Sequence, residues 1–253
     1  MIPKIIHLCW LSGDKFPEDI QKCIDSWHKY LSDYEIWLWD TKRFDINSTI
    51  WTKQAFEAKK YAFAADYIRL YALYNYGGIY LDSDVIVYKS FNDLLHLPYF
   101  VGEDNVHCFE AAVLGCEPKM PWIKEILDRY DGLEFINQDG SYNLRGLPVV
   151  FADRLFPKYK FELVKQPVNY NYEEGILKIF PKDYFNSRDY IGAIKTPNSY
   201  CSHNYMGMWM KARKKSFWKS ITPRPISNLL YTIMYRVSWH KKLEDRQIHY
   251  VNV

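Results

Sequence analysis

The sequence lacks the features that mark several classes of protein. No stretch approaches the roughly 18 consecutive apolar residues of a membrane-spanning helix. The opening residues, "IPKIIHLCW", contain no basic segment followed by a long apolar one, and the chain shows neither internal repeats nor low-complexity linkers. From these absences we expect a folded cytoplasmic protein rather than an integral membrane protein, a secreted precursor or a disordered chain.

Cysteine is also sparse, with five in 253 residues, and no two of them form a C-x-x-C pair. An odd number without such a pair indicates neither a disulfide framework nor a zinc knuckle. We therefore expect reduced thiols, mostly buried, at Cys9, Cys23, Cys108, Cys116 and Cys201.

The residues that are abundant indicate a well-packed chain with an uneven charge. The sequence is 48% hydrophobic and 18% aromatic, which is enough to bury a full core. The formal net charge is +3. Basic residues are concentrated from Lys211 onward, whereas residues 1–210 are mildly acidic. We expect one globular domain over residues 1–215 and a basic segment over residues 216–253.

The first 40 residues predict a β-α-β unit. "KIIHLCW" is an apolar strand, and a helix follows Pro17 with apolar residues at helical spacing. "YEIWLWD" is a second strand. Parallel pairing of two such strands favours an α/β fold. His7, in the first strand, is expected to be a hydrogen-bonded core histidine rather than a ligand.

Further along, apolar stripes predict one long helix from Thr52 to Asn75 that is buried on two sides and capped by Gly77. A helix is expected to begin at Pro121. Other strands are expected in the sequences "YFVGED" and "CFEAAVLG" and over residues 161–165 and 176–180.

The stretch "NYGGIYLDSDVIVY" places two carboxylates, Asp82 and Asp84, in an apolar run. A D-x-D pair alone has little specificity. If the chain is extended here, both side chains point to the same side, where they would repel each other. A divalent cation with oxygen ligands, Mn²⁺ or Mg²⁺, would neutralise them and would also bind a substrate diphosphate. Gly77 and Gly78 fit a tight turn and close approach of a ligand.

Asp66 and Arg69 lie three residues apart, so they share one helical face. One interpretation is an ordinary ion pair. The other is that both point from a buried helix towards a nucleotide sugar, because an unpaired buried charge is unfavourable.

Three ordered blocks carry a family resemblance: "IPKIIHLCW", "AADYIRLYALYNYGGIYLDSDV" and "HNYMGMW" from His203. Together they resemble the DXD-containing glycosyltransferases of family 32, which include the yeast initiating mannosyltransferases and bacterial capsular polysaccharide enzymes. The glucosyltransferase domains of the large clostridial toxins share the core pattern. The resemblance implies a GT-A fold, with a Rossmann-like mixed sheet flanked by helices, and retaining hexosyl transfer assisted by Mn²⁺ or Mg²⁺.

Site roles follow from the resemblance. It implies that Asp84, Asp82 and His203 are metal ligands and that Asp82, Asp84 and Arg69 are the catalytic residues. Nucleotide-sugar binding is implied for Trp10, Asp66, Arg69, Tyr80, Asp82 and Trp209. The expected donor is a UDP-sugar, and the expected acceptor is a saccharide or lipid-linked saccharide in surface polysaccharide synthesis, with no nucleic-acid partner.

This chain departs from the family pattern at two places. Met208 stands where the family often has Ser, and "RGLPVVFADRL" matches the acceptor-side segment only loosely. No side-chain nucleophile is evident, so a front-face transfer is favoured. Four further acids are candidates for orienting the acceptor, although each fits a surface or loop position as well: Glu103, Asp104, Glu110 and Asp139.

Two other functions stay open. A phosphohydrolase of the haloacid dehalogenase type also carries D-x-D after a strand, but Ile86 stands where it needs Thr or Val. A non-catalytic carbohydrate-binding protein is the second alternative. The basic segment carries an amphipathic pattern over residues 225–242, which fits either packing on the body or peripheral binding to the inner face of an anionic membrane.

Overall fold

The computed structural model describes residues 1–103, 109–164, 166, 168–186, 188–189, 192–193 and 195–206. The elements, in chain order, are β1 (Ile5–Cys9), α1 (Glu18–Tyr30), β2 (Glu35–Trp39), η1 (Ile46–Ser48), α2 (Ile50–Glu57), α3 (Tyr61–Tyr76), β3 (Gly78–Leu81), β4 (Val85–Val87), η2 (Asn92–Leu94), β5 (Tyr99–Val101), β6 (Val113–Cys116), α4 (Pro121–Leu127), η3 (Asp128–Tyr130), α5 (Leu147–Leu155), β7 (Lys160–Leu163), β8 (Ile176–Ile179), α6 (Lys182–Phe185), β9 (Arg188–Asp189), β10 (Gly192–Ala193) and β11 (Cys201–His203).

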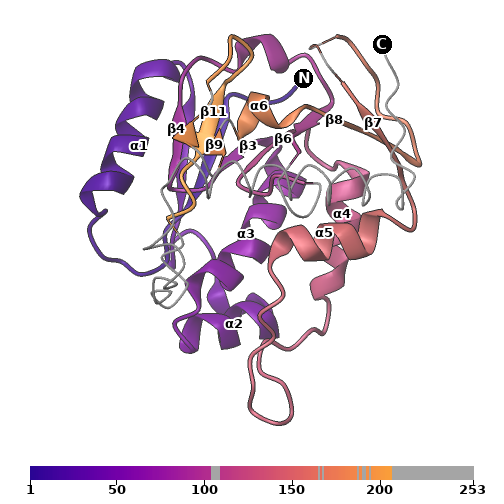
Figure 1. Cartoon of the computed structure of the whole chain (residues 1–253). Helices are drawn as coiled ribbons and strands as arrows, with labels where there is room; N and C mark the ends of the chain where they lie inside the picture. Colours follow the sequence, from indigo (N-terminus) through magenta and orange to yellow (C-terminus); the bar gives the residue numbers. More distant parts are fainter. Residues whose placement is uncertain are drawn as a thin grey trace, which may run out of the picture.

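The main sheet is mixed, with strand order β2-β1-β3-β6-β5. β1 pairs in parallel with both β2 and β3, which confirms the predicted β-α-β unit. β6 runs antiparallel to β3 and to β5. Helices flank the sheet, with α1 on one side and α3, α4 and α5 on the other (Figure 1). This is the α/β architecture expected for a GT-A fold.

Both faces of the central strands are buried, and the alternation along β3 shows why. Ile79 and Leu81 belong to the apolar cluster that contains α1, whereas Tyr80 belongs to the cluster that contains α3 and α4. Successive side chains of a strand point to opposite faces. The residue that follows Leu81, Asp82, therefore emerges at the edge of a sheet that is covered on both sides.

The predicted single helix over residues 52–75 is wrong in one respect, because the chain forms two helices, α2 and α3. The break lies at Lys59, which has a φ of 55°. There the amide of Lys60 donates to Ala55 O at 2.8 Å, as it does where an α-helix ends in a residue of left-handed conformation. Neither Gly nor Pro marks this break in the sequence, so the apolar stripes of the two helices merge into one pattern.

The two glycines at the start of β3, Gly77 and Gly78, serve packing within the protein rather than the expected approach of a ligand. Gly77 caps α3 with a φ of 64°, as predicted, and a Cβ there would lie 2.7 Å from the ring of Pro118. A Cβ on Gly78 would lie 2.7 Å from Ile5 O. Only glycine fits where three backbone segments approach this closely.

The other predicted elements are confirmed, with shorter bounds: β5, β6, α4, β7 and β8 all lie within or next to the expected ranges. No helix in the described part of the chain combines the length and apolar character needed to cross a membrane. The proposed segment 216–253 and its amphipathic pattern lie outside the described residues.

Candidate active site

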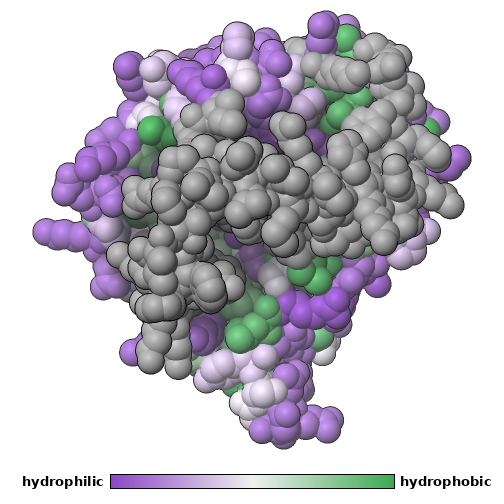
Figure 2. Space-filling view, in the orientation of Figure 1, coloured by the Kyte–Doolittle hydropathy of each residue, from purple (hydrophilic) through white to green (hydrophobic). Residues whose placement is uncertain are grey.

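A cavity of about 430 Å³ opens beside the ends of β1 and β3. Its walls come from the α2–α3 junction, the first half of α3, the turn after β3, the start of α5 and the residues after β11. Among the coloured residues of Figure 2, most are hydrophilic, and a few apolar ones are exposed between α2 and α5. Seven of the eight predicted site residues line this cavity: Trp10, Asp66, Arg69, Tyr80, Asp82, Asp84 and His203. The eighth, Trp209, lies outside the described residues.

Asp82 and Asp84 lie in a tight turn, not in the extended strand that we expected. β3 ends at Leu81 and β4 begins at Val85, whose amide donates to Asp82 O at 2.9 Å. The alternation of side chains therefore cannot explain why the two carboxylates approach each other. The turn brings them together, and ligand atoms of Asp82, Asp84 and His203 all lie within 4.8 Å of one another.

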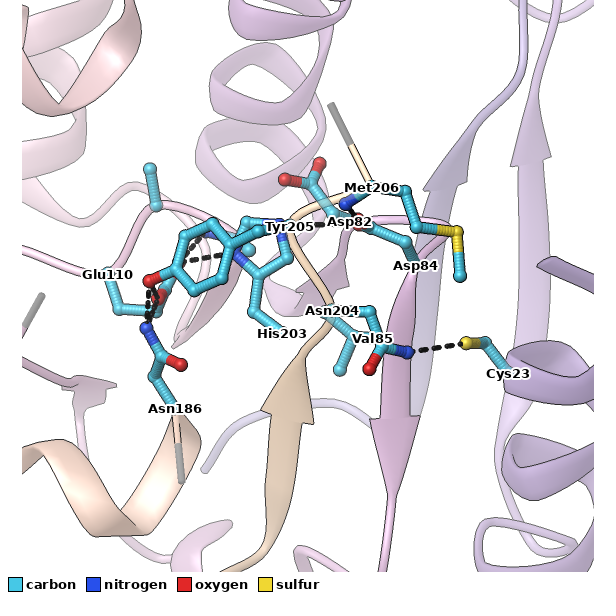
Figure 3. A network of polar contacts seen from close by, with 12 residues as sticks. Cys23, Asp82, Asp84, Val85, Glu110, Asn186, His203, Asn204, Tyr205 and Met206 are labelled. Carbon is cyan, nitrogen blue, oxygen red and sulfur yellow. Dashed lines mark hydrogen bonds and ion pairs between the residues drawn. The ribbon is translucent and has the colours of Figure 1, made fainter. Parts of the chain in front are cut away.

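The segment after β11 holds Asp84 from three directions (Figure 3). The amide of Asn204 donates to Asp84 O at 3.1 Å, and the amide of Met206 donates to Asp84 Oδ2 at 2.8 Å. His203 Nε2 lies 3.3 Å from Asp84 Oδ1. Burial alone would raise the pKa of Asp84, but His203 and the Met206 amide outweigh it and lower the pKa below its usual value. Asp84 is therefore an ionised carboxylate although its residue is only 8% exposed.

Arg69 links Asp66 to the turn, which confirms the predicted ion pair; its role towards a nucleotide sugar stays a prediction. Its Nη2 lies 3.0 Å from Asp66 Oδ1 and 3.2 Å from Asp82 Oδ1, and its Nη1 donates to Ala111 O at 2.8 Å. The Tyr80 ring packs against the guanidinium, and the Tyr80 hydroxyl donates to Asp82 Oδ1 at 2.8 Å. The ion pair thus faces the cavity and orients Asp82.

Asp66 lies at the far side of this pair, close to the start of α5. Burial raises the pKa of Asp66 to about 7, while Arg69 and the backbone amide of Leu147 act in the opposite direction. The N-terminus of α5, in the loosely matching segment "RGLPVVFADRL", therefore belongs to the cavity wall. The sequence pattern alone did not assign it to the site.

His203 lies between two carboxylates, those of Asp84 and Glu110. Burial alone would lower the pKa of His203, but the Glu110 and Asp84 carboxylates raise it well above its usual value. Glu110 is thus a site residue, not a surface acid. Its three companions differ: Glu103 is partly buried and does not line the cavity, Asp139 is on an exposed loop, and Asp104 lies outside the described residues.

Two further residues of the cavity wall carried no sequence signal. Lys59 supplies a cation at the α2–α3 junction. Tyr205, which has a φ of 50°, stacks on His203 with ring centroids 4.1 Å apart. Both are brought to the cavity by backbone in the left-handed region, which non-glycine residues seldom adopt.

Trp10 lies in the cavity wall, where the resemblance implied that it would stack on the donor base. Its indole N–H donates to Asp14 O at 2.8 Å, and its ring packs edge-on against Phe16 at 4.8 Å. The hydrogen bond and the packing fix the ring at the end of β1. A fixed aromatic side chain loses little entropy when a base stacks on it.

The chemistry of the donor set fits a divalent cation. Two carboxylates and one imidazole within 4.8 Å are ligands that suit Mn²⁺, and the carboxylates suit Mg²⁺ as well. In the described part of the cavity wall, four carboxylates face two permanently charged cations, Arg69 and Lys59. Among the described residues, the cationic partner of Asp84 is the titratable His203, so a divalent cation would supply charge that Arg69 and Lys59 do not bring to Asp84.

An acidic D-x-D turn at a strand end of an α/β sheet, beside a cavity, is the arrangement expected of an enzyme that transfers a sugar from an activated donor. Residues 17–101 match the family described as "Glycosyltransferase sugar-binding region containing DXD motif". Residues 17–101 thus carry the DXD-containing sugar-binding region of glycosyltransferases.

Among curated proteins, the chain is 29% identical to inositol phosphoceramide mannosyltransferase 2 of Schizosaccharomyces pombe over 75% of this chain and 55% of that protein. It is 32% identical to mannosyl phosphorylinositol ceramide synthase SUR1 of Saccharomyces cerevisiae over 67% of this chain and 48% of that protein. The chain thus spans about half the length of these relatives. Among solved structures it is similar to the PaToxG glycosyltransferase, with a TM-score of 0.47 and 22% identity over 62% of this chain and 68% of that one.

Proposed function

We propose that this protein transfers a hexose from a nucleotide sugar to a saccharide or lipid-linked acceptor, with a divalent cation held by Asp82, Asp84 and His203. The observation that carries the proposal is the convergence of these three ligands at the wall of a cavity of about 430 Å³. The family match supports the same type of reaction.

The bound cation would neutralise charge on the diphosphate and on the leaving nucleoside diphosphate. The protein's own residues prepare the site for it. Arg69 and the Tyr80 hydroxyl orient Asp82, and the amides of Asn204 and Met206 fix Asp84. Because these donors are held before substrate binds, they cost no reorganisation during the reaction.

Among retaining mechanisms, the state of the cavity carboxylates favours a front-face transfer over one with a covalent glycosyl-enzyme intermediate. A glycosidase of the covalent type needs a second carboxylate that is available as a nucleophile. In the described part of the cavity, Asp66 and Asp82 are paired with Arg69, and Asp84 and Glu110 accept backbone amides. Because each of these four carboxylates is oriented by a protein partner, none of them is placed as a free nucleophile.

The donor and acceptor classes are part of the proposal. The names of the yeast relatives describe mannosyl transfer to inositol phosphoceramide, which favours a lipid-linked acceptor and adds GDP-mannose to the UDP-sugars as a candidate donor. Synthesis of a surface polysaccharide on a lipid-linked intermediate is consistent with the same chemistry. A screen of nucleotide sugars for metal-dependent hydrolysis would distinguish among the donors.

Binding and turnover test the proposal separately. Isothermal titration with UDP and with GDP should show tight binding of one of them only when Mn²⁺ is present. Asp84→Asn should then lower metal-dependent sugar release by at least about 100-fold, since even the outer partners of metal ligands contribute 10–100-fold. The matched control is Asp25→Asn, which changes an exposed aspartate of α1 and should leave turnover unchanged.

The results also decide between this function and the alternatives. Metal-dependent nucleotide binding without turnover of any nucleotide sugar would favour a non-catalytic carbohydrate-binding protein. Hydrolysis of a phosphomonoester would favour a phosphohydrolase, for which Asp82 would have to leave Arg69 and the Tyr80 hydroxyl. Nucleotide binding that is indifferent to Mn²⁺ would remove Asp82, Asp84 and His203 from their assigned role.

A further inference from the structure

Glu110 is a buried carboxylate in the cavity wall, only 3% exposed. Its Oε1 accepts the amide of Ala112 at 2.8 Å, and its Oε2 accepts Nδ2 of Asn186 at 2.5 Å (Figure 3). These two bonds fix the carboxylate relative to β6 and α6. Glu110 therefore presents a rigid acceptor to whatever faces it.

The group that Glu110 faces is the imidazole of His203. His203 Nδ1 lies 3.4 Å from Glu110 Oε1, while His203 Nε2 lies 3.3 Å from Asp84 Oδ1. The ring is also covered by Tyr205, whose hydroxyl lies 3.4 Å from Glu110 Oε2. One nitrogen of the ring is thus turned to Glu110 and the other to the metal-ligand cluster.

A carboxylate at this place needs an explanation beyond structural support. Burying a charge is unfavourable unless it is paired. Among the described residues no lysine or arginine pairs with Glu110, and its one ion-pair partner is His203. A neutral amide side chain could accept the Ala112 amide equally well. We therefore attribute the negative charge of Glu110 to its interaction with His203.

Among the described residues, His203 Nδ1 is buried and makes no hydrogen bond, and the acceptor that faces it is Glu110 Oε1 at 3.4 Å. We propose that Glu110 is a positioning residue for metal binding: it accepts the Nδ1 proton in a hydrogen bond when the cation binds and so directs the Nε2 lone pair towards the cation held with Asp82 and Asp84. Partners of this kind fix the ring orientation of a metal-binding histidine and increase its basicity. The inference rests on the proposed function, because it requires the cation site.

A double-mutant cycle on Mn²⁺ affinity tests the inference without any activity measurement. Free Mn²⁺ is followed by electron paramagnetic resonance during titration of the full chain with UDP or GDP present. Glu110→Ala should weaken Mn²⁺ binding by about 10–100-fold. In a His203→Ala background the same substitution should have little further effect, because two residues that act through one contact are not additive.

Two variants separate positioning from structural support. Glu110→Gln keeps an oxygen that can accept from Ala112 and His203, and Asn186 has a buried Oδ1 without a hydrogen-bond partner that can turn to the new amide. Glu110→Gln should therefore weaken Mn²⁺ binding less than Glu110→Ala does, because the orienting oxygen stays, but should not restore wild-type affinity, because the negative charge is lost. Glu103→Ala removes a partly buried acid that does not line the cavity, and it should leave Mn²⁺ affinity unchanged.

The possible outcomes are distinct. If wild-type protein binds Mn²⁺ and the effects of Glu110→Ala and His203→Ala are fully additive, Glu110 does not act through His203 and this inference is overturned, while the proposed function stands. An unchanged affinity in folded Glu110→Ala protein overturns it as well. If wild-type protein binds no Mn²⁺ with either nucleotide, the proposed function fails and the inference fails with it.

Discussion

Burial determines the hydrogen bonds and the protonation of His7, a side chain of the first strand. It is fully buried, its Nε2 lies 2.6 Å from Gly77 O, and the indole N–H of Trp39 donates to its Nδ1 at 3.0 Å. Because Nδ1 accepts, Nε2 carries the proton and donates to Gly77 O. The predicted hydrogen-bonded core histidine is confirmed. It ties β1 to β2 and to the C-terminus of α3.

This arrangement predicts a loss of stability in mild acid. Burial lowers the pKa of His7 to about 4 from an unfolded value of 6.5. The unfolded chain therefore binds the proton first, so the stabilising contribution is full above pH 6.5 and is lost as the pH falls towards 4. The expected loss between pH 7 and pH 5 is about 2 kcal/mol.

Urea denaturation across this pH range measures the effect. His7→Gln can donate to Gly77 O without titrating, so its stability should depend less on pH than that of the wild type. The exposed His28→Gln serves as the control and should follow the wild-type profile. Equal pH profiles for His7→Gln and the wild type would show that His7 is not the responsible group.

Among the secondary elements, the α2–α3 junction combines a strained backbone with a position on the cavity. Lys59 has a φ of 55°, and its side chain is in the cavity wall. Left-handed backbone costs a non-glycine residue about 1 kcal/mol relative to glycine. Strain of this kind is often kept at functional sites, where the side chain is needed.

We therefore expect Lys59→Gly to stabilise the fold by up to about 1 kcal/mol and to weaken binding of the nucleotide diphosphate. Lys53→Gly is the matched control in the exposed face of α2, where glycine should destabilise by about 1 kcal/mol. Denaturant melts and nucleotide titrations measure the two effects. If Lys59→Gly destabilises the protein, the backbone at Lys59 is not strained relative to glycine and this prediction is wrong.

For the whole molecule, the mildly acidic residues 1–210 and the basic segment 216–253 predict an orientation on a membrane. The amphipathic pattern over residues 225–242 places basic and aromatic residues beside an apolar stripe. A lipid-linked acceptor would lie at such a surface. Membrane binding stays a prediction, since the segment lies outside the described residues.

Sedimentation with liposomes tests this orientation. The full chain should sediment with anionic vesicles and not with zwitterionic ones, and the binding should weaken as salt is added. Deletion of residues 225–253 should abolish it. Binding that survives the deletion, or that does not respond to salt, would place the membrane contact elsewhere or favour packing of the segment on the body.

Local patterns were sufficient for most elements and for naming residues that line the cavity. The apolar strand and helix periods of the first 40 residues depend on neighbours in sequence, so the β-α-β unit could be predicted. The family blocks named seven residues that all line one cavity. The one long helix was wrong because Lys59, not a glycine or proline, occupies the break, and a single left-handed residue leaves no composition signal.

The arrangement of those residues depended on contacts between distant segments, which a linear pattern does not contain. The D-x-D pair meets His203 because β11 pairs with β4, some 120 residues earlier in the chain, and because a turn replaces the expected extended strand. Glu110 became a site residue only through its contacts with His203 and Asn186. Residue types and local periods thus specify which chemistry the site can perform. Burial and long-range pairing specify which side chains take part in it, because charge and hydrogen-bond energies depend on distance in space.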